Sequence, residues 1–298
     1  MRVAPTAELR DFRGQPCAQL SLPQGDTVLI ALHGAHVVSW LTADGRERFY
    51  LSPTAVFDGI QPIRGGVPLC FPQFNQRVLA GQPLAKHGFA RTQSWAVQDL
   101  GLAPDGTSAQ ATLVLHSNAA TLALWPHAFV ATLTVRLQPD GLRVQFDVEN
   151  TDVAPWPFAL ALHTYLQVDG IDGCTLHGLA RHDFWDAVAH LPQPDVVSTQ
   201  PDQALAFAGE TDRVYGDVTT PLLVQHAGGT LQLTQSASLP DVVVWNPGAS
   251  RCAVLGDMPP DGYQHMLCVE AACINTPVLL EPGQRWCGWQ QLRVVPAV

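Results

Sequence analysis

The chain has 298 residues, of which 47% are hydrophobic and 14% charged, and its formal net charge is −10. This length is enough for one large core, and we expect a single domain spanning residues 1–298. A nucleic-acid binder needs a basic surface that neutralises phosphates, and the sequence contains no basic run. The same deficit argues against an anionic membrane as a partner. No segment reaches the ~20 apolar residues of a membrane-spanning helix.

Cysteine usage and the N-terminal segment indicate the compartment. The seven cysteines form no C-x-x-C pair, and most lie among apolar residues, as reduced buried thiols do. The N-terminal segment has acidic residues and lacks the apolar stretch of a secretory signal. We therefore expect a cytoplasmic protein, either a monomer or a weak oligomer.

The predicted elements are strands almost throughout. A strand-rich stretch over residues 26–42 is broken at Gly34, and the turn tripeptide at residues 139–141 and the glycine pair at 228–229 each predict a hairpin. Residues 55–60 and 203–208 are expected to form single helical turns. The remaining predicted strands, with those of the two hairpins, cover residues 111–116, 129–137, 142–149, 158–168, 221–226, 230–234, 241–245, 266–274 and 286–295. This pattern predicts an all-β fold, a large antiparallel β-sandwich.

Two segments concentrate cationic residues in a chain with only 16 lysines and arginines. In IRGGVPLCFPQF (residues 63–74), Arg64 precedes two glycines that permit a sharp turn beside a ligand. In KHGFAR (residues 86–91), Lys86, His87 and Arg91 lie within six residues, and Lys86 is the only lysine of the chain. Taken alone, each arginine would also suit a surface ion pair.

Two further segments place an ionisable residue in an apolar strand. In FALALHTY (residues 158–165), alternation puts His163 on the face of two small alanines, which leaves space beside the ring. In MLCVEA (residues 266–271), Glu270 interrupts an apolar run, and buried carboxylates are rare unless they are paired or functional. By itself, His163 would also suit a core histidine bonded to a carbonyl, and Glu270 a partner for an arginine.

Together these segments resemble the glucose-6-phosphate 1-epimerases of the aldose 1-epimerase superfamily. The matching segments are RGGVPLCFPQF, HGFART, ALHTY, ETDRVY, VVVWNP, DMPPDGYQHMLCVE and LLEPGQRWCGWQ, in the order of the family. They span roughly residues 60–290. The resemblance implies a galactose mutarotase-like β-supersandwich with the sugar in a cleft over a concave sheet.

The resemblance also implies roles for the ionisable residues. His163 falls on the general acid and Glu270 on the general base, while Arg64 and Arg91 fall on arginines that hold the phosphate. Lys86 departs from the family pattern, in which a neutral residue precedes HGFAR, and its own charge would add a point charge to the phosphate site. The residues with implied contacts to the sugar or the cleft wall are Asp212 for the hydroxyl groups, His87 for the wall and Trp245 for stacking on a sugar face.

This chemistry needs no cofactor. Anomer exchange removes the C1 hydroxyl proton and adds a proton to the ring oxygen, so one base and one acid are enough. No metal is expected, because His33 and His36, three apart on a predicted strand, would face opposite sides, and no Cys/His cluster has ligand spacing. The favoured function is therefore hexose-6-phosphate mutarotation. The alternatives are an aldose 1-epimerase acting on unphosphorylated sugars and a non-catalytic carbohydrate-binding or sensing module.

Overall fold

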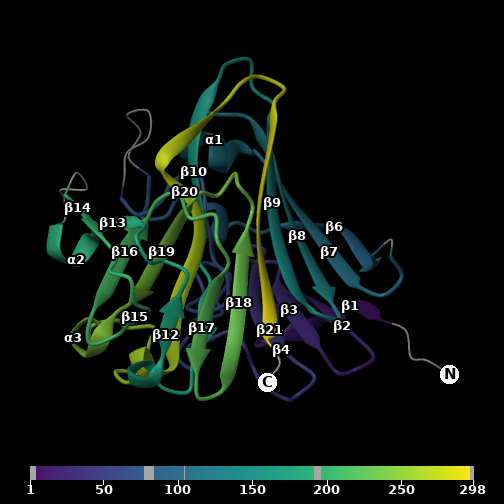
Figure 1. The fold of residues 1–298 in the computed structure, drawn as a ribbon. Helices are drawn as coiled ribbons and strands as arrows, with labels where there is room; N and C mark the ends of the chain where they lie inside the picture. The colour runs from purple at the N-terminus through teal and green to yellow at the C-terminus, as the bar shows by residue number, and fades with distance from the viewer. Residues whose placement is uncertain (1–4, 77–83, 104, 191–195, 296–298) are drawn as a thin grey trace.

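The protein is described here from a computed structural model, which covers residues 5–76, 84–103, 105–190 and 196–295. Its strands form three sheets, and every strand pair in the described residues is antiparallel (Figure 1). The predicted all-β sandwich is confirmed. Within the same residues, no helix has the length and apolar character needed to cross a bilayer.

A small N-terminal sheet and a large nine-stranded sheet lie against each other through β1, β2, β6 and β7 (Figure 1). The small sheet consists of β1 (Thr6–Phe12), β2 (Gln15–Ser21), β3 (Thr27–Ala31) and β4 (His36–Leu41). The nine-stranded sheet consists, in spatial order, of β15 (Leu205–Ala206), β12 (Thr175–His177), β17 (Leu222–His226), β18 (Gly229–Gln235), β21 (Arg285–Val295), β9 (Gly141–Asn150), β8 (Phe129–Gln138), β7 (Ala109–His116) and β6 (Ala96–Leu102).

The third sheet has eight strands, and β20 runs through its middle. In spatial order it consists of β14 (Val197–Thr199), β13 (Asp183–Asp186), β16 (Thr211–Tyr215), β19 (Asp241–Asn246), β20 (Met266–Leu280), β10 (Trp156–Leu162) and β5 (Leu69–Cys70), with β11 (Tyr165–Gln167) also paired to β20. The helical elements are short: α1 (Ala119–Leu124), α2 (Ala187–His190), α3 (Gly248–Cys252), η1 (Ala90–Thr92), η2 (Ile171–Gly173) and η3 (Gly262–His265).

Strict alternation of burial explains how the sheets share a core. On β8, buried residues alternate with partly exposed ones over all ten positions, so that one face packs inward and the other faces out. One cluster of buried side chains joins the three sheets, with Leu20 from the small sheet, Leu133 from the nine-stranded sheet and Leu160 from the eight-stranded sheet as members. The layers therefore share one hydrophobic core.

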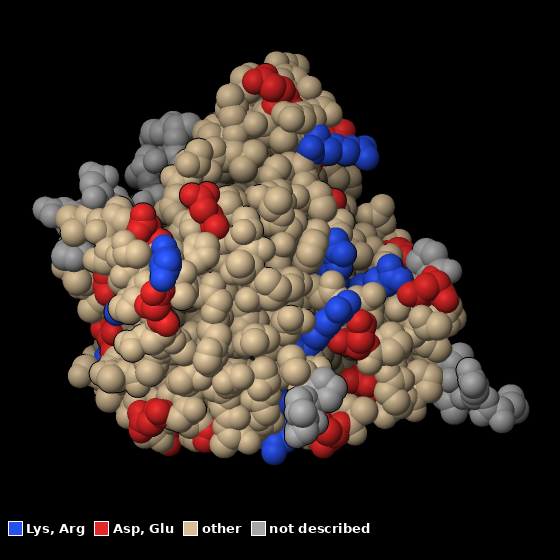
Figure 2. Space-filling model, in the orientation of Figure 1, with Lys and Arg blue, Asp and Glu red and all other residues tan. Residues whose placement is uncertain are grey.

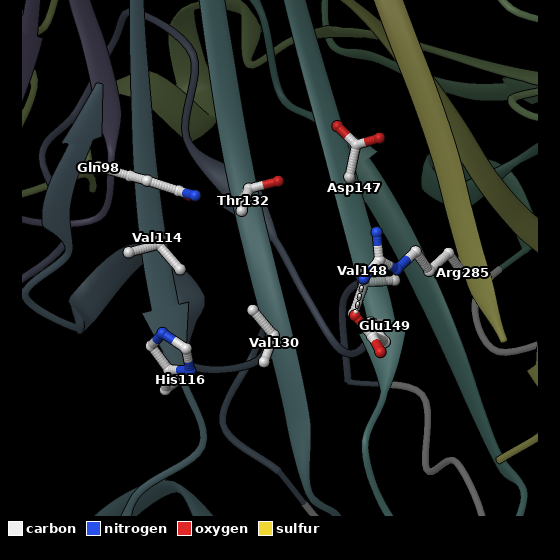
Figure 3. Close-up of a pocket in the computed structure, with 9 residues that line it drawn as sticks. All are labelled: Gln98, Val114, His116, Val130, Thr132, Asp147, Val148, Glu149 and Arg285. Atoms are coloured by element: carbon white, nitrogen blue, oxygen red, sulfur yellow. Dashed lines mark ion pairs between the residues drawn. The ribbon is translucent and has the colours of Figure 1, made fainter. Parts of the chain in front are cut away.

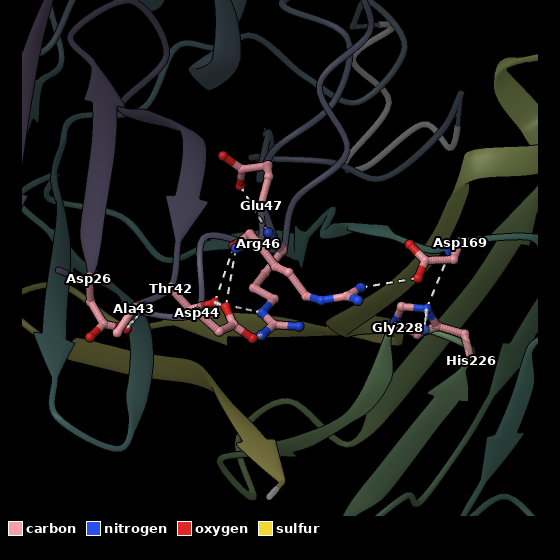
Figure 4. A network of polar contacts seen from close by, with 10 residues as sticks. Asp26, Thr42, Ala43, Asp44, Arg46, Glu47, Asp169, His226 and Gly228 are labelled. Carbon is pink, nitrogen blue, oxygen red and sulfur yellow. Dashed lines mark hydrogen bonds and ion pairs between the residues drawn. The ribbon is translucent and has the colours of Figure 1, made fainter. Parts of the chain in front are cut away.

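A polar network also links the small sheet to the β17–β18 hairpin (Figure 4). Arg46, in the turn after β4, pairs with Asp169 at 3.1 Å. The backbone N–H groups of Asp169 and Gly228 both donate to Nδ1 of His226, each at 3.2 Å. Both ion-pair partners are largely exposed, at 50% and 41% of their side-chain surface, so the pair contributes little stability. Its value lies in fixing the position of the hairpin.

The structure departs from the sequence expectations at three places. The predicted strand 158–168 is two strands, β10 and β11, because the chain leaves the sheet at residues 163–164. Residues 55–60 have no helical turn, and residues 205–206 pair as β15 instead of forming one. Both short segments carry few local helix signals, and long-range pairing or loop contacts decide their conformation. The two predicted hairpins, β8–β9 and β17–β18, are confirmed.

Candidate functional site

A cavity of about 540 Å³ lies on one face of the eight-stranded sheet. The pairing of three strands brings together the residues of the cavity floor. Glu270 on β20 lies opposite Val243 on β19, and Trp245 on β19 lies opposite Asp212 on β16. All four of these residues line the cavity. Beneath it, Ala161 and its small or apolar neighbours on the same sheet face form a separate buried cluster, as the alternation in FALALHTY predicts.

His163 and Glu270 meet at the bottom of this cavity. Nδ1 of His163 lies 3.3 Å from Oε1 of Glu270, and the residues are only 7% and 1% exposed. The His163 backbone N–H donates to the carbonyl of Pro68 at 3.0 Å, which fixes the histidine where β10 ends. The ring stacks on Tyr165 with centroids 4.9 Å apart and an interplanar angle of 9°. The structure thus brings the predicted acid and base into contact.

Burial displaces the pKa values of this pair in opposite directions. Desolvation, followed by the charges of Arg91 and Arg64, lowers the pKa of His163 well below its usual value. Desolvation, reinforced by the nearby Asp212 carboxylate, raises the pKa of Glu270 well above its usual value. In the unliganded cavity both shifts favour a neutral imidazole and a protonated carboxyl. Ionisable groups whose pKa values are strongly displaced by their surroundings are typical of functional sites.

The RGG loop delivers Arg64 to the cavity wall. The guanidinium donates through Nε to Oδ2 of Asp257 at 3.0 Å and through Nη1 to the Tyr165 hydroxyl at 2.8 Å. Gly65 and Gly66 both adopt a positive φ, at 112° and 62°. A Cβ on Gly66 would lie 2.1 Å from the Val37 carbonyl oxygen, so only glycine fits there.

Two histidines from the β3–β4 turn hold this loop in place. Nε2 of His36 donates to the Gly65 carbonyl at 2.6 Å, and Nε2 of His33 donates to the Gln61 carbonyl at 2.9 Å. The expectation that His33 and His36 face opposite sides of a strand is wrong, because residues 32–35 form a turn with positive φ at Gly34 and Ala35. Both rings therefore reach the same loop, where they act as structural donors.

His87 lines the cavity next to His163. Its backbone N–H donates to the Asn75 carbonyl at 2.9 Å, and its Nδ1 accepts the Asn75 N–H at 3.1 Å. This reciprocal pair commits Nδ1 as an acceptor, so the neutral ring carries its proton on Nε2. Desolvation and the charge of His163 lower the pKa of His87 well below its usual value. Its ring meets that of His163 edge-on, with centroids 5.4 Å apart.

Four cationic side chains surround the pair, and they differ in what they contact. Arg64 is engaged by Asp257, with its Nη2 3.0 Å from Oδ2. Lys86 and Arg251 line the cavity, and among the described residues neither side chain has a hydrogen bond or ion pair. Arg91 is not among the lining residues, and its Nη2 donates instead to the Lys86 carbonyl at 2.8 Å. The structure therefore places Arg91 in support of the Lys86 segment.

Asp212 and Trp245 complete the lining that the sequence anticipated. Desolvation raises the pKa of Asp212 to about 6, while the nearby Lys86 opposes this rise. The Trp245 ring stands edge-on to His163, with centroids 6.1 Å apart and an interplanar angle of 84°. The indole also stands at 84° to the ring of Tyr165, with centroids 6.0 Å apart, and forms part of the cavity wall.

Sequence reasoning did not single out Arg251, Tyr165 or Asp257. Tyr165 and Asp257 lie inside motifs that were recognised, and their partner Arg64 could have suggested them. Arg251 is a solitary arginine on α3, in the unremarkable stretch GASRC, and no local signal distinguishes it. Only the fold brings α3 to the rim of the cavity.

A second cavity, of about 480 Å³, lies on the outer face of the nine-stranded sheet (Figure 3). Its side chains stand out from β6, β7, β8, β9 and β21, and valines supply much of the surface. Its one acidic and basic pair, Glu149 and Arg285, is satisfied at 2.9 Å. The described side chains that line this cavity include no buried acid–base pair, so the cavity around His163 is the better candidate site.

Comparison with known proteins gives consistent matches over nearly the whole chain. The family described as Aldose 1-epimerase matches residues 16–293. A protein of Cenchrus ciliaris named "Putative glucose-6-phosphate 1-epimerase" is 34% identical over 276 residues, covering 90% of this chain and 81% of that protein. A protein of the same name from Escherichia coli strain K12 is 33% identical over 246 residues, covering 81% and 78%.

Solved structures agree on the fold. The crystal structure titled as a "putative mutarotase" from Salmonella typhimurium superimposes with a TM-score of 0.86 at 27% identity, covering 98% of this chain and 94% of that one. A galactose mutarotase-like protein from Clostridium acetobutylicum gives a TM-score of 0.75 at 15% identity, with 99% of both chains covered. The second match supports the shared fold alone.

Proposed function

We propose that this chain, which belongs to the aldose 1-epimerase family, interconverts the α and β anomers of a hexose 6-phosphate. The observation that carries the proposal is the buried contact of His163 with Glu270 in a cavity whose rim holds the unpaired cations Lys86 and Arg251. The names of the relatives from Cenchrus ciliaris and Escherichia coli support the same substrate class.

The reaction needs one proton shared between two groups. Ring opening moves the O1 proton to Glu270 and a proton from His163 to O5, as the C1–O5 bond breaks and the C1=O1 bond forms. After rotation about the C1–C2 bond, closure returns each proton by the reverse path, so the pair ends as it began. The unliganded cavity favours the proton on Glu270. The form with His163 as acid is reached when the sugar is bound and the two side chains close from 3.3 Å to hydrogen-bond geometry, so that the proton passes from Glu270 to His163.

The sugar would be held by neutral and anionic groups around the pair. Asp212 lines the cavity as an acceptor for sugar hydroxyl groups. His87, with Nδ1 occupied by the Asn75 N–H, offers Nε2–H as a donor. The indole of Trp245 offers an apolar surface to a sugar face. None of these groups needs to change charge during the reaction.

The phosphate would be held at the cationic rim. Lys86 and Arg251 have no hydrogen bond or ion pair in the described parts of the chain, and only the nearby Asp212 carboxylate offsets the charge of Lys86, so both side chains can bind an anion. Arg64 contributes charge but is already bonded to Asp257 and Tyr165. Arg91 supports Lys86 through its carbonyl. A neutral sugar would give two unpaired cations no reason to line this cavity.

The test is two-dimensional NMR exchange between the α and β C1–H signals of glucose 6-phosphate, repeated with glucose and corrected for uncatalysed exchange. We expect acceleration for the phosphate ester. Arg251→Gln and Lys86→Gln should each reduce kcat/KM on the ester by roughly tenfold to a hundredfold, as expected for a lost charged hydrogen bond. Turnover of glucose, if present, should not fall.

The matched control is Arg10→Gln, which removes an exposed arginine of β1 far along the chain from the site. It should leave both rates unchanged. Equal acceleration of glucose and its phosphate, insensitive to both rim variants, would instead support an aldose 1-epimerase for free sugars. Absence of acceleration on either sugar would support a carbohydrate-binding module.

A further inference from the structure

Cys268 lies beside the acid–base pair, and the proposed reaction makes no use of it. It precedes Glu270 by two residues on β20, so both side chains point to the same face of the sheet. On the neighbouring strand β11, Cys268 lies opposite Tyr165, whose ring stacks on His163. Cys268 is fully buried. A thiol thus lies buried next to the imidazole and the carboxyl group that line the bottom of the cavity.

The three side chains are close enough to bind one ion. A ring nitrogen of His163, Sγ of Cys268 and a carboxylate oxygen of Glu270 all lie within 4.8 Å of one another. Tetrahedral Zn²⁺ with bonds of about 2.0–2.3 Å places its ligand atoms roughly 3.3–3.8 Å apart. The separations between these atoms therefore need to shorten by about 1.5 Å at most, which side-chain rotation can supply.

Two of these groups are also short of partners. Nδ1 of His163 and Oε2 of Glu270 are buried and accept or donate no hydrogen bond within the part of the chain that the structure describes. The 3.3 Å approach of Nδ1 to Oε1 is an ion-pair distance without hydrogen-bond geometry. Buried polar atoms are nearly always bonded, and an exception points to an ion, a water or a ligand that occupies the site.

We propose that His163, Cys268 and Glu270 form a three-ligand site for a divalent cation of Zn²⁺ type, with its fourth position open to the cavity. One nitrogen, one thiolate sulfur and one carboxylate oxygen are a donor set that Zn²⁺ accepts, whereas Mg²⁺ and Ca²⁺ prefer oxygen alone. The thiolate and carboxylate neutralise the charge of the ion. Asp212 adds a negative charge nearby, opposing the rim cations.

Such an ion would act as an inhibitor. Coordination removes the lone pair of His163 and the carboxylate of Glu270, the two groups that exchange protons with the sugar. Binding of the ion and binding of the sugar would then exclude each other. The inhibition rests on the proposed mutarotase function, but binding of the ion does not, so the two can be tested separately.

The test uses Co²⁺ as a spectroscopic probe on the full chain, after reduction and treatment with a chelator. We expect one Co²⁺ per chain, with a thiolate-to-cobalt charge-transfer band in the near ultraviolet and visible bands typical of a tetrahedral ion. One equivalent of Zn²⁺ should bleach both. Cys268→Ser should abolish the charge-transfer band and weaken Zn²⁺ binding in calorimetry at least about tenfold.

Two cysteine variants serve as controls. Cys70→Ser removes a buried thiol of β5 that belongs to the cluster below the cavity, and Cys287→Ser removes the exposed thiol of β21. Both should retain the band. A band that is absent from the wild-type chain, persists in Cys268→Ser, or disappears in Cys287→Ser would overturn the proposal.

A second measurement avoids dependence on the folding of a variant. The ¹¹³Cd NMR signal of the wild-type chain loaded with one equivalent of Cd²⁺ should have the shift of a single sulfur with nitrogen and oxygen donors. A shift of oxygen donors alone would also overturn the proposal. Metal binding without mutarotation would contradict only the proposed function, and mutarotation without metal binding only this inference.

Discussion

Glu270 shows how much a single buried carboxyl group depends on its surroundings. It lies on a central strand with 1% of its surface exposed, and its Oε2 has no partner among the described residues. Burying a carboxylate without full hydrogen bonding is costly, and protonation reduces that cost. We therefore expect Glu270 to lower the stability of the fold at neutral pH, where it is the base of the proposed reaction.

This predicts that Glu270→Gln is more stable than the wild type at pH 7 and inactive. Burial raises the folded-state pKa, so as pH rises the unfolded chain loses this proton first and the folded state is penalised from about pH 4.5 upward. For each pH unit over which the folded state holds one proton more than the unfolded chain, the free energy of unfolding falls by about 1.4 kcal/mol. Glutamine carries no such penalty. Mutarotation should fall by roughly 10²- to 10⁴-fold.

The measurement is the free energy of unfolding in urea at pH 4 and pH 7 for both proteins. The extra stability of Glu270→Gln over the wild type should be present at pH 7. It should almost vanish at pH 4, where residue 270 of the wild type is protonated in both the folded and the unfolded state. Glu8→Gln, on exposed β1, is the control and should change little at either pH. A variant less stable than the wild type at pH 7 would contradict the pKa argument.

At the scale of elements, the RGG loop depends on contacts that only glycine permits. Its backbone is bonded on both sides: the Gly66 N–H donates to the Tyr50 carbonyl at 2.8 Å, and the Tyr165 N–H donates to the Gly66 carbonyl at 2.8 Å. The loop thereby joins the segment around Tyr50 to β11, beside His163 and Glu270. The positions of Arg64 and Tyr165 both follow from this short stretch.

Gly66→Ala is therefore expected to cost several kcal/mol in unfolding free energy, well above the cost of Gly106→Ala. The two glycines have nearly the same φ, 62° and 66°, so both alanines carry the left-handed strain of about 1–2 kcal/mol. Only at Gly66 does the new Cβ meet backbone, 2.1 Å from the Val37 oxygen, whereas nothing lies within 4 Å at Gly106. Equal losses in chemical denaturation would show that space at Gly66 does not matter.

At the scale of the whole molecule, one hydrophobic core joins the three sheets through apolar packing. We propose on this ground that they fold as the single domain expected for residues 1–298. On the face shown in Figure 2, charged side chains stand in small mixed groups separated by wide uncharged surface, with no basic patch.

We expect a single cooperative unfolding transition, with equal calorimetric and van't Hoff enthalpies. Leu20→Ala in the small sheet and Leu133→Ala in the nine-stranded sheet both delete a fully buried side chain of the same cluster. Each should destabilise by about 2–5 kcal/mol and shift that one transition. Two transitions, of which Leu20→Ala moved only one, would show that the small sheet unfolds independently.

The sequence by itself determined the features that depend on local order. Alternating burial specified the strands, and turn residues at 139–141 and 228–229 specified two hairpins. His163 and Glu270 were recognisable because ionisable residues are rare in an apolar strand unless they are paired or functional, and no oppositely charged residue lies next to either in the sequence. The motif resemblance then placed both in one site, and the fold brings them within 3.3 Å.

Tertiary structure alone decided which groups meet. Arg251 reaches the cavity and Arg91 does not line it, although Arg91 lies in a motif and Arg251 in none. Cys268 joins His163 because β11 and β20 pair in one particular register. Such encounters depend on strand register and loop path over a hundred residues. Strand register and loop path are set by how the whole core packs, so they cannot be predicted from a local sequence pattern.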